Sequence, residues 1–390
     1  MREVSIDAQI FSKIKNGKNH FYDRELPKNF PSLAPGEWFH LNYKDEFFTA
    51  FGNDHVKAGP KVWVLSSEKF NPNDYLISTI QASLNKRAQL YLGEGKRLVF
   101  GQNDNLPGLI VDSYEKHLIV QINTAGIDSH RELIRKHLEA KTEKKVVFLD
   151  NQAYREDESL PVYEQSLPLD EEITIVDSGF TYKMPFEKLQ KLGFYFDHRD
   201  NRNKYESYLN KLKEAEKVRC LDLFCYLGAW GLHSIRAGVK QIDFVDQANL
   251  ENEVLKNVSS TNKDIISRFN RADVFKYLQE SLNQKRKWNV VICDPPAFCK
   301  SSKQKAQAIS GYKKLYNKIF RVIESKGTLV AASCTKYVSL EEFTSLISQQ
   351  AKENNRKIWL RDIGIQSMDH PISNMNDSAN YIKYALYYVE

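Results

Sequence analysis

Acidic residues stand at the ends of three successive strand-like segments in the second half of the chain. Asp222 lies near the end of the apolar run 218–224, Asp246 ends a second run, and Asp273 precedes a helical stretch. In an open α/β sheet the carboxyl ends of the strands form a cofactor crevice, where an acid accepts hydrogen bonds from the ribose of an adenosine. Asp273 is placed to accept from an adenine amino group. Each acid alone is more often a helix N-cap, but three in succession favour a cofactor site.

The turn that follows Asp222 does not match a dinucleotide fingerprint. It reads Phe224-Cys-Tyr226-Leu-Gly228-Ala-Trp-Gly231, which lacks the G-x-G-x-x-G spacing. Its acidic and aromatic character disfavours a pyrophosphate and suits a cofactor that carries a positive charge beside an amino group. S-adenosyl-L-methionine is the common cofactor of this kind, so the turn is predicted to bind it. The alternative is an ordinary strand–turn–helix without a ligand.

The segment Asp294-Pro295-Pro296-Ala-Phe298 ends the fourth strand. Two consecutive prolines can neither continue a ladder nor enter a helix interior, so they fix an extended backbone. An acid, a rigid turn and an aromatic ring form a pocket for a flat base, which is recognised by hydrogen bonding and stacking. A rigid loop without a ligand is the alternative.

Basic residues flank this segment in the sequence and are predicted to contact a phosphate backbone, although some belong to the solvated face of a helix. They are Lys285, Arg286, Lys287, Lys300, Lys303, Lys305, Lys313, Lys314, Lys318 and Arg321.

Cys334 follows the fifth strand in Ala332-Ser-Cys-Thr335. A thiol at the carboxyl end of a strand, beside the crevice, can act as a nucleophile if its thiolate is stabilised. A buried cysteine is otherwise an inert small apolar residue. Cys299 is the rival nucleophile, whereas Cys220, Cys225 and Cys293 are interpreted as packing residues.

These residues need an α/β sheet to position them, and the rhythm from residue 181 onward is strand–helix–strand. The last two strands are joined by a Pro/Ser/Asn-rich loop too short for a crossover helix, so they form an antiparallel hairpin. The predicted fold is a Rossmann-like methyltransferase sheet with an antiparallel terminal hairpin. The expected strands are 218–224, 241–246, 288–294, 327–333, 357–364 and 381–389, and the expected helices are 229–237, 250–258, 274–283, 306–324 and 340–353.

The first half of the chain has a different pattern. Short β-type runs separated by Gly and Pro predict a small β-barrel module over 1–70. A helix at 75–92, three strand-like runs, a helix at 129–140 and a strand at 145–149 predict an α+β middle domain that extends with its linker over 71–180. The acidic segment 153–172 is interpreted as the linker. Residues 181–390 form the predicted methyltransferase domain.

Composition excludes several classes of protein. An apolar content of 42% with 27% charged residues is that of a folded protein. The longest apolar runs are too short for a membrane span, and the five cysteines contain no C-x-x-C pair, so neither a membrane nor a metal is expected. Unpaired cysteines indicate a cytoplasmic location. The net charge is −5 over residues 1–180 and +11 over 181–390, giving +6, and the basic half favours RNA as partner.

With these motifs in place, the chain resembles the bacterial large-subunit ribosomal RNA cytosine-C5 methyltransferases that carry an N-terminal PUA domain. The resemblance spans nearly all residues. It rests on 97–100, 105–112, the segment Gly193-Phe-Tyr-Phe-Asp-His-Arg-Asp-Asn-Arg202, 221–231, Asp246, Asp273, Asp294–Phe298, 333–335 and Asp369-His-Pro371.

The resemblance implies a specific chemistry. Asp294 and Phe298 would hold a flipped cytosine, and the Cys334 thiolate would attack C6 so that C5 accepts a methyl group from S-adenosylmethionine. It also assigns Asp197 and Arg199 to the cofactor site, and Asp294 borders both cofactor and base. Departures are Tyr226-Leu-Gly-Ala229 in place of Y-T-G-G and Tyr337 in place of a histidine. The resemblance leaves open whether the protein forms a homodimer.

Three other functions remain open from the sequence. Methylation of a guanine nitrogen would use the same cofactor and would tolerate loss of Cys334. An RNA-binding or assembly protein on an inactive scaffold is favoured by Leu227 and Ala229. A nicotinamide oxidoreductase is disfavoured by the missing glycine fingerprint and by the terminal hairpin.

Overall fold

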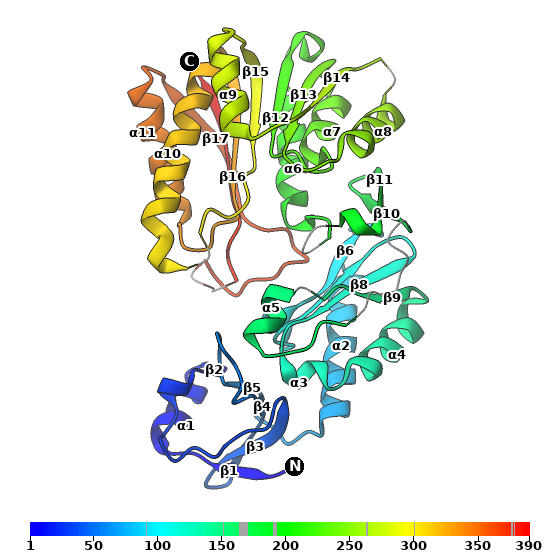
Figure 1. Ribbon diagram of the computed structural model, residues 1–390, viewed down its shortest axis with the longest axis vertical. Coiled ribbons are helices and arrows are strands. Elements are labelled where there is room, and N and C mark those ends of the chain that lie inside the picture. Colours follow the sequence, from blue (N-terminus) through cyan, green and yellow to red (C-terminus); the bar gives the residue numbers. More distant parts are fainter. Residues whose placement is uncertain are drawn as a thin grey trace. The chain divides into compact units, whose positions relative to one another are not determined.

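The computed structural model describes the chain except Tyr91, Asn151, 164–170, 190–192, Lys263, Lys300, Asn376 and Ser378. It separates into two compact units, one comprising residues 1–175 and 185–194 and the other 176–184 and 195–390 (Figure 1). Among the described residues, no helix combines the length and apolar character that a membrane crossing requires. The predicted domain boundaries at residues 70 and 180 stay predictions.

The first unit begins with a five-stranded sheet of order β1-β3-β4-β5-β2. β3 and β4 pair antiparallel over their whole length, and Phe39, Leu41, Phe48 and Ala50 are buried in the core of this sheet. The three runs that the sequence predicted correspond to β3, β4 and β5, whereas the helix α1 was not predicted. The elements are β1 (Glu3–Ser5), α1 (Ala8–Lys15), β2 (His20–Phe21), β3 (Glu37–Tyr43), β4 (Glu46–Gly52) and β5 (Val62–Ser66).

A four-stranded sheet of order β6-β7-β8-β9 follows in the same unit. Trp38 of β3 shares its core, and the Trp38 indole donates to the Gly126 carbonyl over 2.9 Å. The helix α5 occupies part of the segment 153–172 that was predicted as a linker, residues 164–170 of that segment lie outside the described residues, and the linker stays a prediction. The elements are α2 (Pro72–Ala88), β6 (Lys96–Phe100), β7 (Leu109–Ser113), β8 (His117–Ile122), α3 (Ala125–Asp128), α4 (Arg131–Thr142), β9 (Lys145–Phe148) and α5 (Gln152–Asp157).

The second unit is built on a seven-stranded sheet of order β14-β13-β12-β15-β16-β18-β17. β12 pairs parallel with both β13 and β15, so the chain order reverses between β12 and β15. β18 runs antiparallel between β16 and β17, which confirms the predicted terminal hairpin. The strands are β12 (Arg219–Leu223), β13 (Gln241–Asp246), β14 (Ile266–Arg271), β15 (Trp288–Cys293), β16 (Ile323–Ser333), β17 (Ile358–Gly364) and β18 (Lys383–Val389), and a small hairpin pairs β10 (Glu172–Asp177) with β11 (Phe180–Pro185).

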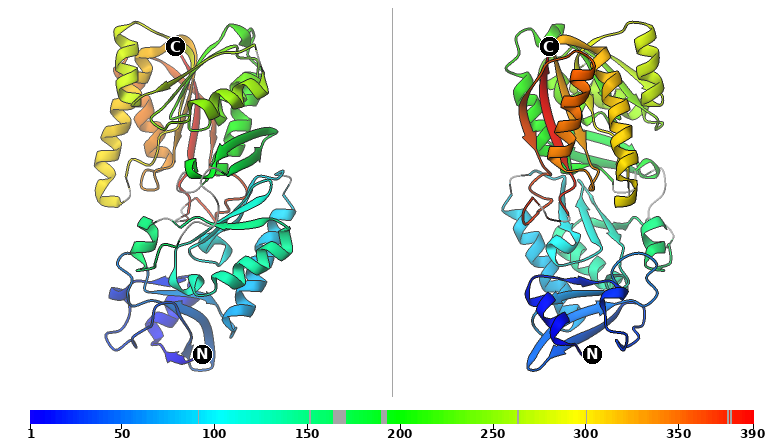
Figure 2. Two further views of the ribbon diagram at one scale, coloured as in Figure 1. Left: turned by 45° about the vertical axis from the view of Figure 1, so that its right-hand side comes forward. Right: turned by 90° about the vertical axis from the view of Figure 1, so that its left-hand side faces the viewer.

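Helices cover both faces of this sheet (Figure 1 and Figure 2). Alternation along β12 sends Leu221 and Leu223 into the core shared with α9, α10 and α11, while Cys220 and Asp222 point toward α6 and α7. α9 and α11 match their predicted bounds. The helices are α6 (Arg199–Leu209), α7 (Ala229–Arg236), α8 (Glu251–Thr261), α9 (Val274–Asn283), α10 (Lys305–Val322) and α11 (Leu340–Glu353).

Candidate active site

Asp222 lies at the point where strand order reverses. The Asp222 carboxylate is fully buried on β12, and its Oδ2 accepts from the Gly231 amide over 2.9 Å, at the start of α7. Burial, with the nearby Asp294 and Asp246 carboxylates, raises the pKa of Asp222 well above its ordinary value. The structure therefore brings the carboxyl groups of Asp222, Asp246 and Asp294 near one another, and their role in cofactor binding stays a prediction.

The turn after Asp222 is held in a left-handed conformation. Phe224, Tyr226 and Gly228 have φ of 61°, 48° and 77°. Positive φ strains the two aromatic residues, and such strain is typical of ligand-binding turns. Asp246 secures the turn, because its Oδ2 accepts from the Tyr226 amide over 2.9 Å.

Asp273 lies at the N-terminus of α9. Its Oδ1 accepts from the Lys276 amide over 3.0 Å and its Oδ2 from the Gln247 side chain over 2.8 Å. The carboxylate thus caps the helix, which was the alternative reading of this residue. Its role in binding adenine stays a prediction.

Asp197 and Arg199 are neighbours in sequence but make different contacts. Asp197 accepts from the Tyr381 hydroxyl over 2.8 Å. The Arg199 guanidinium is buried between Asp177, at 2.5 Å, and Asp369, at 3.1 Å. Burial opposes the Arg199 charge, but these two carboxylates outweigh it and raise the pKa of Arg199. Arg199 has a structural task in this ion-pair network, and its assignment to the cofactor stays a prediction.

Asp294 leaves the end of β15 and is held by two aromatic side chains that the sequence reading did not name. The Trp230 indole donates to its Oδ2 over 2.9 Å, and His198 Nε2 lies 3.6 Å from its Oδ1. The Asn201 amide donates to His198 Nδ1 over 3.1 Å, so Nδ1 is the acceptor, and His198 Nε2 has no hydrogen-bond partner among the described residues. The Trp230 hydrogen bond therefore orients the Asp294 carboxylate.

Cys334 lies beside the Asp294 turn. Its Sγ is 3.7 Å from the Pro295 carbonyl oxygen, so the structure brings together two segments that are 39 residues apart. Pro296 is exposed, while the Phe298 ring packs on Tyr312 at a centroid distance of 4.5 Å. The Phe298 amide donates to the Thr335 hydroxyl over 3.1 Å, which ties the two segments together. Base stacking on Phe298 stays a prediction.

Lys383 is a further residue of this site that the sequence reading missed. It is 4% exposed at the first position of β18, paired with Ser333, and its Nζ donates to the Thr335 carbonyl over 2.6 Å. Burial lowers the pKa of Lys383 to about 8, against a partial opposing effect of Cys334. The sequence signal that could have identified Lys383 is its position as a single cation at the start of the otherwise apolar strand β18.

The predicted basic surface divides between two ends of β15. Lys285, Arg286 and Lys287 precede the strand, so they lie about 20 Å from Asp294, at roughly 3.3 Å per residue. They therefore lie away from the Asp294 turn that they flank in the sequence, and their contact with a phosphate backbone stays a prediction. Lys303 and Lys305 lie near the active-site end of α10, and Lys300 is outside the described residues.

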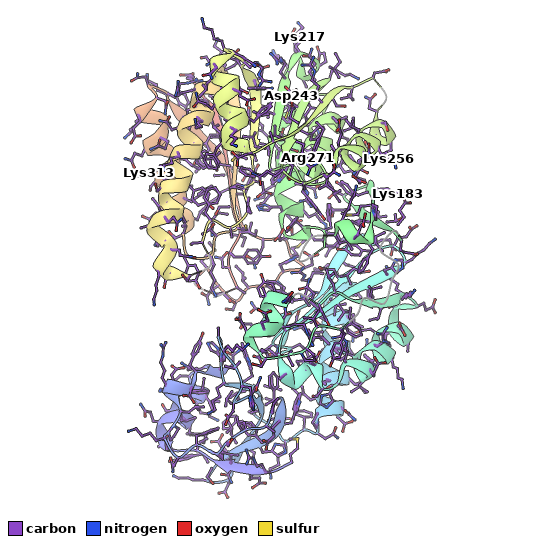
Figure 3. The ribbon with its side chains drawn as sticks, in the orientation of Figure 1. Lys183, Lys217, Asp243, Lys256, Arg271 and Lys313 are labelled. Carbon is purple, nitrogen blue, oxygen red and sulfur yellow. The ribbon has the colours of Figure 1, made fainter. Side chains whose placement is uncertain are left out.

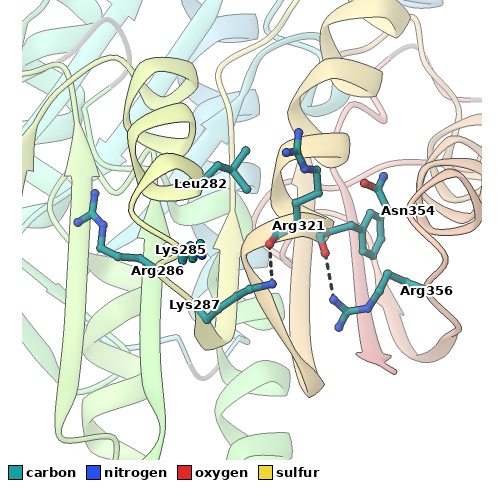
Figure 4. A pocket seen from close by; sticks show the side chains of 8 residues that line it. Leu282, Lys285, Arg286, Lys287, Arg321, Asn354 and Arg356 are labelled. Atoms are coloured by element: carbon teal, nitrogen blue, oxygen red, sulfur yellow. Dashed lines mark hydrogen bonds between the residues drawn. The ribbon is translucent and has the colours of Figure 1, made fainter.

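The displaced cations line a hollow of about 460 Å³ with Arg321 and Arg356 (Figure 4). Arg356 is held by backbone carbonyls, including that of Glu324 over 2.8 Å, and Lys287 by the carbonyl of Arg321 over 2.7 Å. The hollow is thus an electropositive surface without an acidic lining residue.

Among the described residues, no group of three His, Cys, Asp or Glu side chains is placed to hold a metal ion. A parallel sheet closed by an antiparallel last strand, with carboxylates at its reversal point, defines the class of S-adenosylmethionine-dependent methyltransferases. The chain belongs to the S-adenosylmethionine-dependent methyltransferase family, whose model matches residues 133–356.

Relatives and solved structures agree with this family. A protein from Tolumonas auensis named ribosomal RNA large subunit methyltransferase I is 28% identical and covers 83% of this chain and 82% of its own length. A protein of the same name from Shewanella amazonensis is 28% identical over 95% of this chain and 97% of its own. A S-adenosylmethionine-dependent methyltransferase from Streptococcus mutans has the same fold over 100% of both chains, with a TM-score of 0.77 and 20% identity.

The described residues fit the cofactor. The buried Oδ1 of Asp222 has no hydrogen-bond partner among the described residues, although burial of an unpaired oxygen is unfavourable. A ligand with an ammonium group would satisfy that oxygen and would offset the carboxylates of Asp246 and Asp294. S-adenosylmethionine carries such a group and a sulfonium, and it is the family's methyl donor.

Proposed function

We propose that this protein methylates C5 of a cytosine in large-subunit ribosomal RNA, with Cys334 as nucleophile. The observation that carries the proposal is the position of the Cys334 thiol beside the Asp294 turn, at the carboxyl edge of the sheet. The names of the relatives support ribosomal RNA as substrate class. Methylation of a nitrogen would leave this thiol without a task.

Each step falls to a specific side chain. The Cys334 thiolate forms the bond to C6, and the electron pair of the C5–C6 double bond moves toward C5 and the ring. Asp294, which is oriented by its hydrogen bond from Trp230, shares a proton with N3, and this proton neutralises the negative charge that develops there. S-adenosylmethionine supplies the methyl group that C5 accepts. Loss of the C5 proton then allows the sulfur–C6 bond to break and restores the free cysteine.

RNA contacts outside the catalytic crevice complete the proposal. We assign the β-module over residues 1–70 to RNA binding as a PUA-like domain, and the cationic hollow around Lys285 and Arg321 to the phosphate backbone. The hollow favours polyanion binding because several cations and no acidic residue line it. A homodimer stays a prediction.

Labelled S-adenosylmethionine and large-subunit ribosomal RNA from a strain that lacks this gene test the proposal. Mass spectrometry of the nucleosides is expected to find the label in 5-methylcytidine, and Cys334→Ala is expected to abolish it while cofactor binding stays intact. Label in a methylguanosine, or turnover that survives Cys334→Ala, would overturn the cysteine mechanism.

A further inference from the structure

Lys383 is a buried lysine without a counter-ion. Its Nζ makes one hydrogen bond, to the Thr335 carbonyl, and no carboxylate lies within 4.0 Å of it among the described residues. A buried ammonium is costly unless it is paired. The group that it faces electrostatically is the Cys334 thiol, with Cys299 and Glu342 contributing less. The fold therefore keeps an unneutralised cation beside the nucleophile.

The groups around Cys334 have opposite effects on the pKa of its thiol. Burial raises the pKa of the Cys334 thiol to about 12, and the Asp294 and Asp197 carboxylates act in the same direction. Lys383 is the cation that lowers the pKa, while Tyr195 and Tyr312 also face the thiol as neutral phenols. In the protein without RNA, burial and the two carboxylates outweigh Lys383 and keep the pKa of the thiol raised.

We propose that Lys383 and Asp294 form an opposed pair that switches Cys334 on only when the base is bound. This inference rests on the proposed function and deepens it. Once Asp294 and N3 of a bound cytosine share a proton, the repulsion of a thiolate by Asp294 is reduced, and Lys383 then dominates. The S–H bond then breaks, its electron pair stays on sulfur, and the proton passes to water. The thiolate that results pairs with the Lys383 ammonium.

The switch has a selective advantage that follows from its geometry. A permanently ionised thiolate at a solvent-reachable crevice reacts with oxidants and electrophiles. A thiol that ionises only against a bound cytosine avoids this reaction. Lys383 acts through Cys334 rather than on the base, so its role is visible in the chemistry of the thiol even without RNA.

The test measures the alkylation of Cys334 by iodoacetamide from pH 7 to 10, read by peptide mass spectrometry in the RNA-free protein. Lys383→Met is expected to slow the reaction about tenfold at a fixed pH, because one pKa unit changes the thiolate fraction tenfold. Asp294→Asn is expected to accelerate it by a similar factor. Lys383→Arg, which keeps the charge, is expected to restore the wild-type rate below pH 8.

The two variants shift in opposite directions, which a loss of folding cannot imitate. The buried Cys220 and Cys293 serve as internal controls, since their reactivity reports unfolding. Equal rates for wild type and Lys383→Met, or a slower reaction in Asp294→Asn, would overturn the proposal. The alkylation result is independent of turnover: if the labelled nucleoside were a methylguanosine, the proposed function would fail while the thiol measurement still decided the role of Lys383.

Discussion

The Trp230 indole donates a hydrogen bond of 2.9 Å to the Asp294 carboxylate, and this bond joins α7 of the cofactor turn to the rigid turn after β15. The ring of Trp230 also stacks on Tyr384 of β18, with centroids 5.9 Å apart and planes at 11°. One side chain therefore connects the turn after β12, the turn after β15 and the terminal hairpin of the second unit. Its sequence position, directly after Gly228-Ala229, gave no hint of this role.

Trp230→Phe is expected to lower kcat with little effect on cofactor affinity. The variant keeps the ring that stacks on Tyr384 and removes only the N–H that orients Asp294. A hydrogen bond to a charged group contributes about 1.5–3 kcal/mol, which corresponds to roughly a 10- to 100-fold loss of rate. Steady-state kinetics and calorimetric titration with S-adenosylmethionine measure the two effects. A cofactor affinity that falls as much as kcat would show that Trp230 serves the cofactor instead.

The affinity for S-adenosylmethionine is expected to rise with pH above the ordinary carboxyl range. Burial raises the pKa of Asp222, so the protein without cofactor retains a proton that a cationic ligand displaces. Binding then releases a proton, and the affinity increases with pH until Asp222 is ionised in the free protein. Calorimetry in two buffers of different ionisation enthalpy measures the released proton. In Asp222→Asn the release should disappear, and its persistence would assign the proton to another group.

The main features of the second unit could be predicted from the sequence because its strands are continuous apolar runs that end in Asp222, Asp246 and Asp294. The strand β14 was counted before Asp273 but received no bounds, because it reads Ile-Ser-Arg-Phe-Asn-Arg, an edge strand with no buried side chain. The antiparallel β18 was predicted from loop length alone. The local pattern of apolar and polar residues was sufficient to predict a strand wherever burial had determined its residue types.

The side chains that complete the site could not be predicted, because each depends on a contact between distant segments. His198 and Trp230 reach Asp294 across 96 and 64 residues, and Lys383 reaches Thr335 across 48. Lys285 shows the opposite case: it is near Asp294 in the sequence, but a full strand separates the two residues in space.

Lys383→Met is expected to stabilise the protein at pH 7 while it impairs the thiol. Burial lowers the pKa of Lys383 from 10.5 to about 8, so between these values the unfolded chain binds a proton that the folded protein does not. The free energy of unfolding therefore rises with pH across that window, by about 3 kcal/mol in total. At neutral pH the buried Lys383 is charged, and the folded protein bears the full cost of burying it. Urea denaturation at pH 7 and pH 10 measures the difference between the two proteins. The gap should favour the variant at pH 7 and narrow toward pH 10; a variant that is less stable at pH 7 would show that the Thr335 hydrogen bond outweighs the burial of charge.

Reversing charge in the hollow is expected to weaken RNA binding without affecting the cofactor. Lys285→Glu with Arg321→Glu removes the two hollow cations whose side chains are exposed, and leaves the Arg321 carbonyl available to Lys287. Two lost phosphate contacts reduce the slope of log K against log salt by about 1.5 to 2.

The matched control is Lys256→Glu with Lys217→Glu, which makes the same charge change at exposed positions outside the hollow (Figure 3). Filter binding of large-subunit ribosomal RNA at several salt concentrations compares the two pairs, and calorimetry verifies that both still bind S-adenosylmethionine. Equal losses in both pairs would mean that only net charge matters. A loss confined to the Lys285 and Arg321 pair would place RNA along the full length of α10, since Lys305 starts this helix near the active site and Arg321 lies near its end at the hollow.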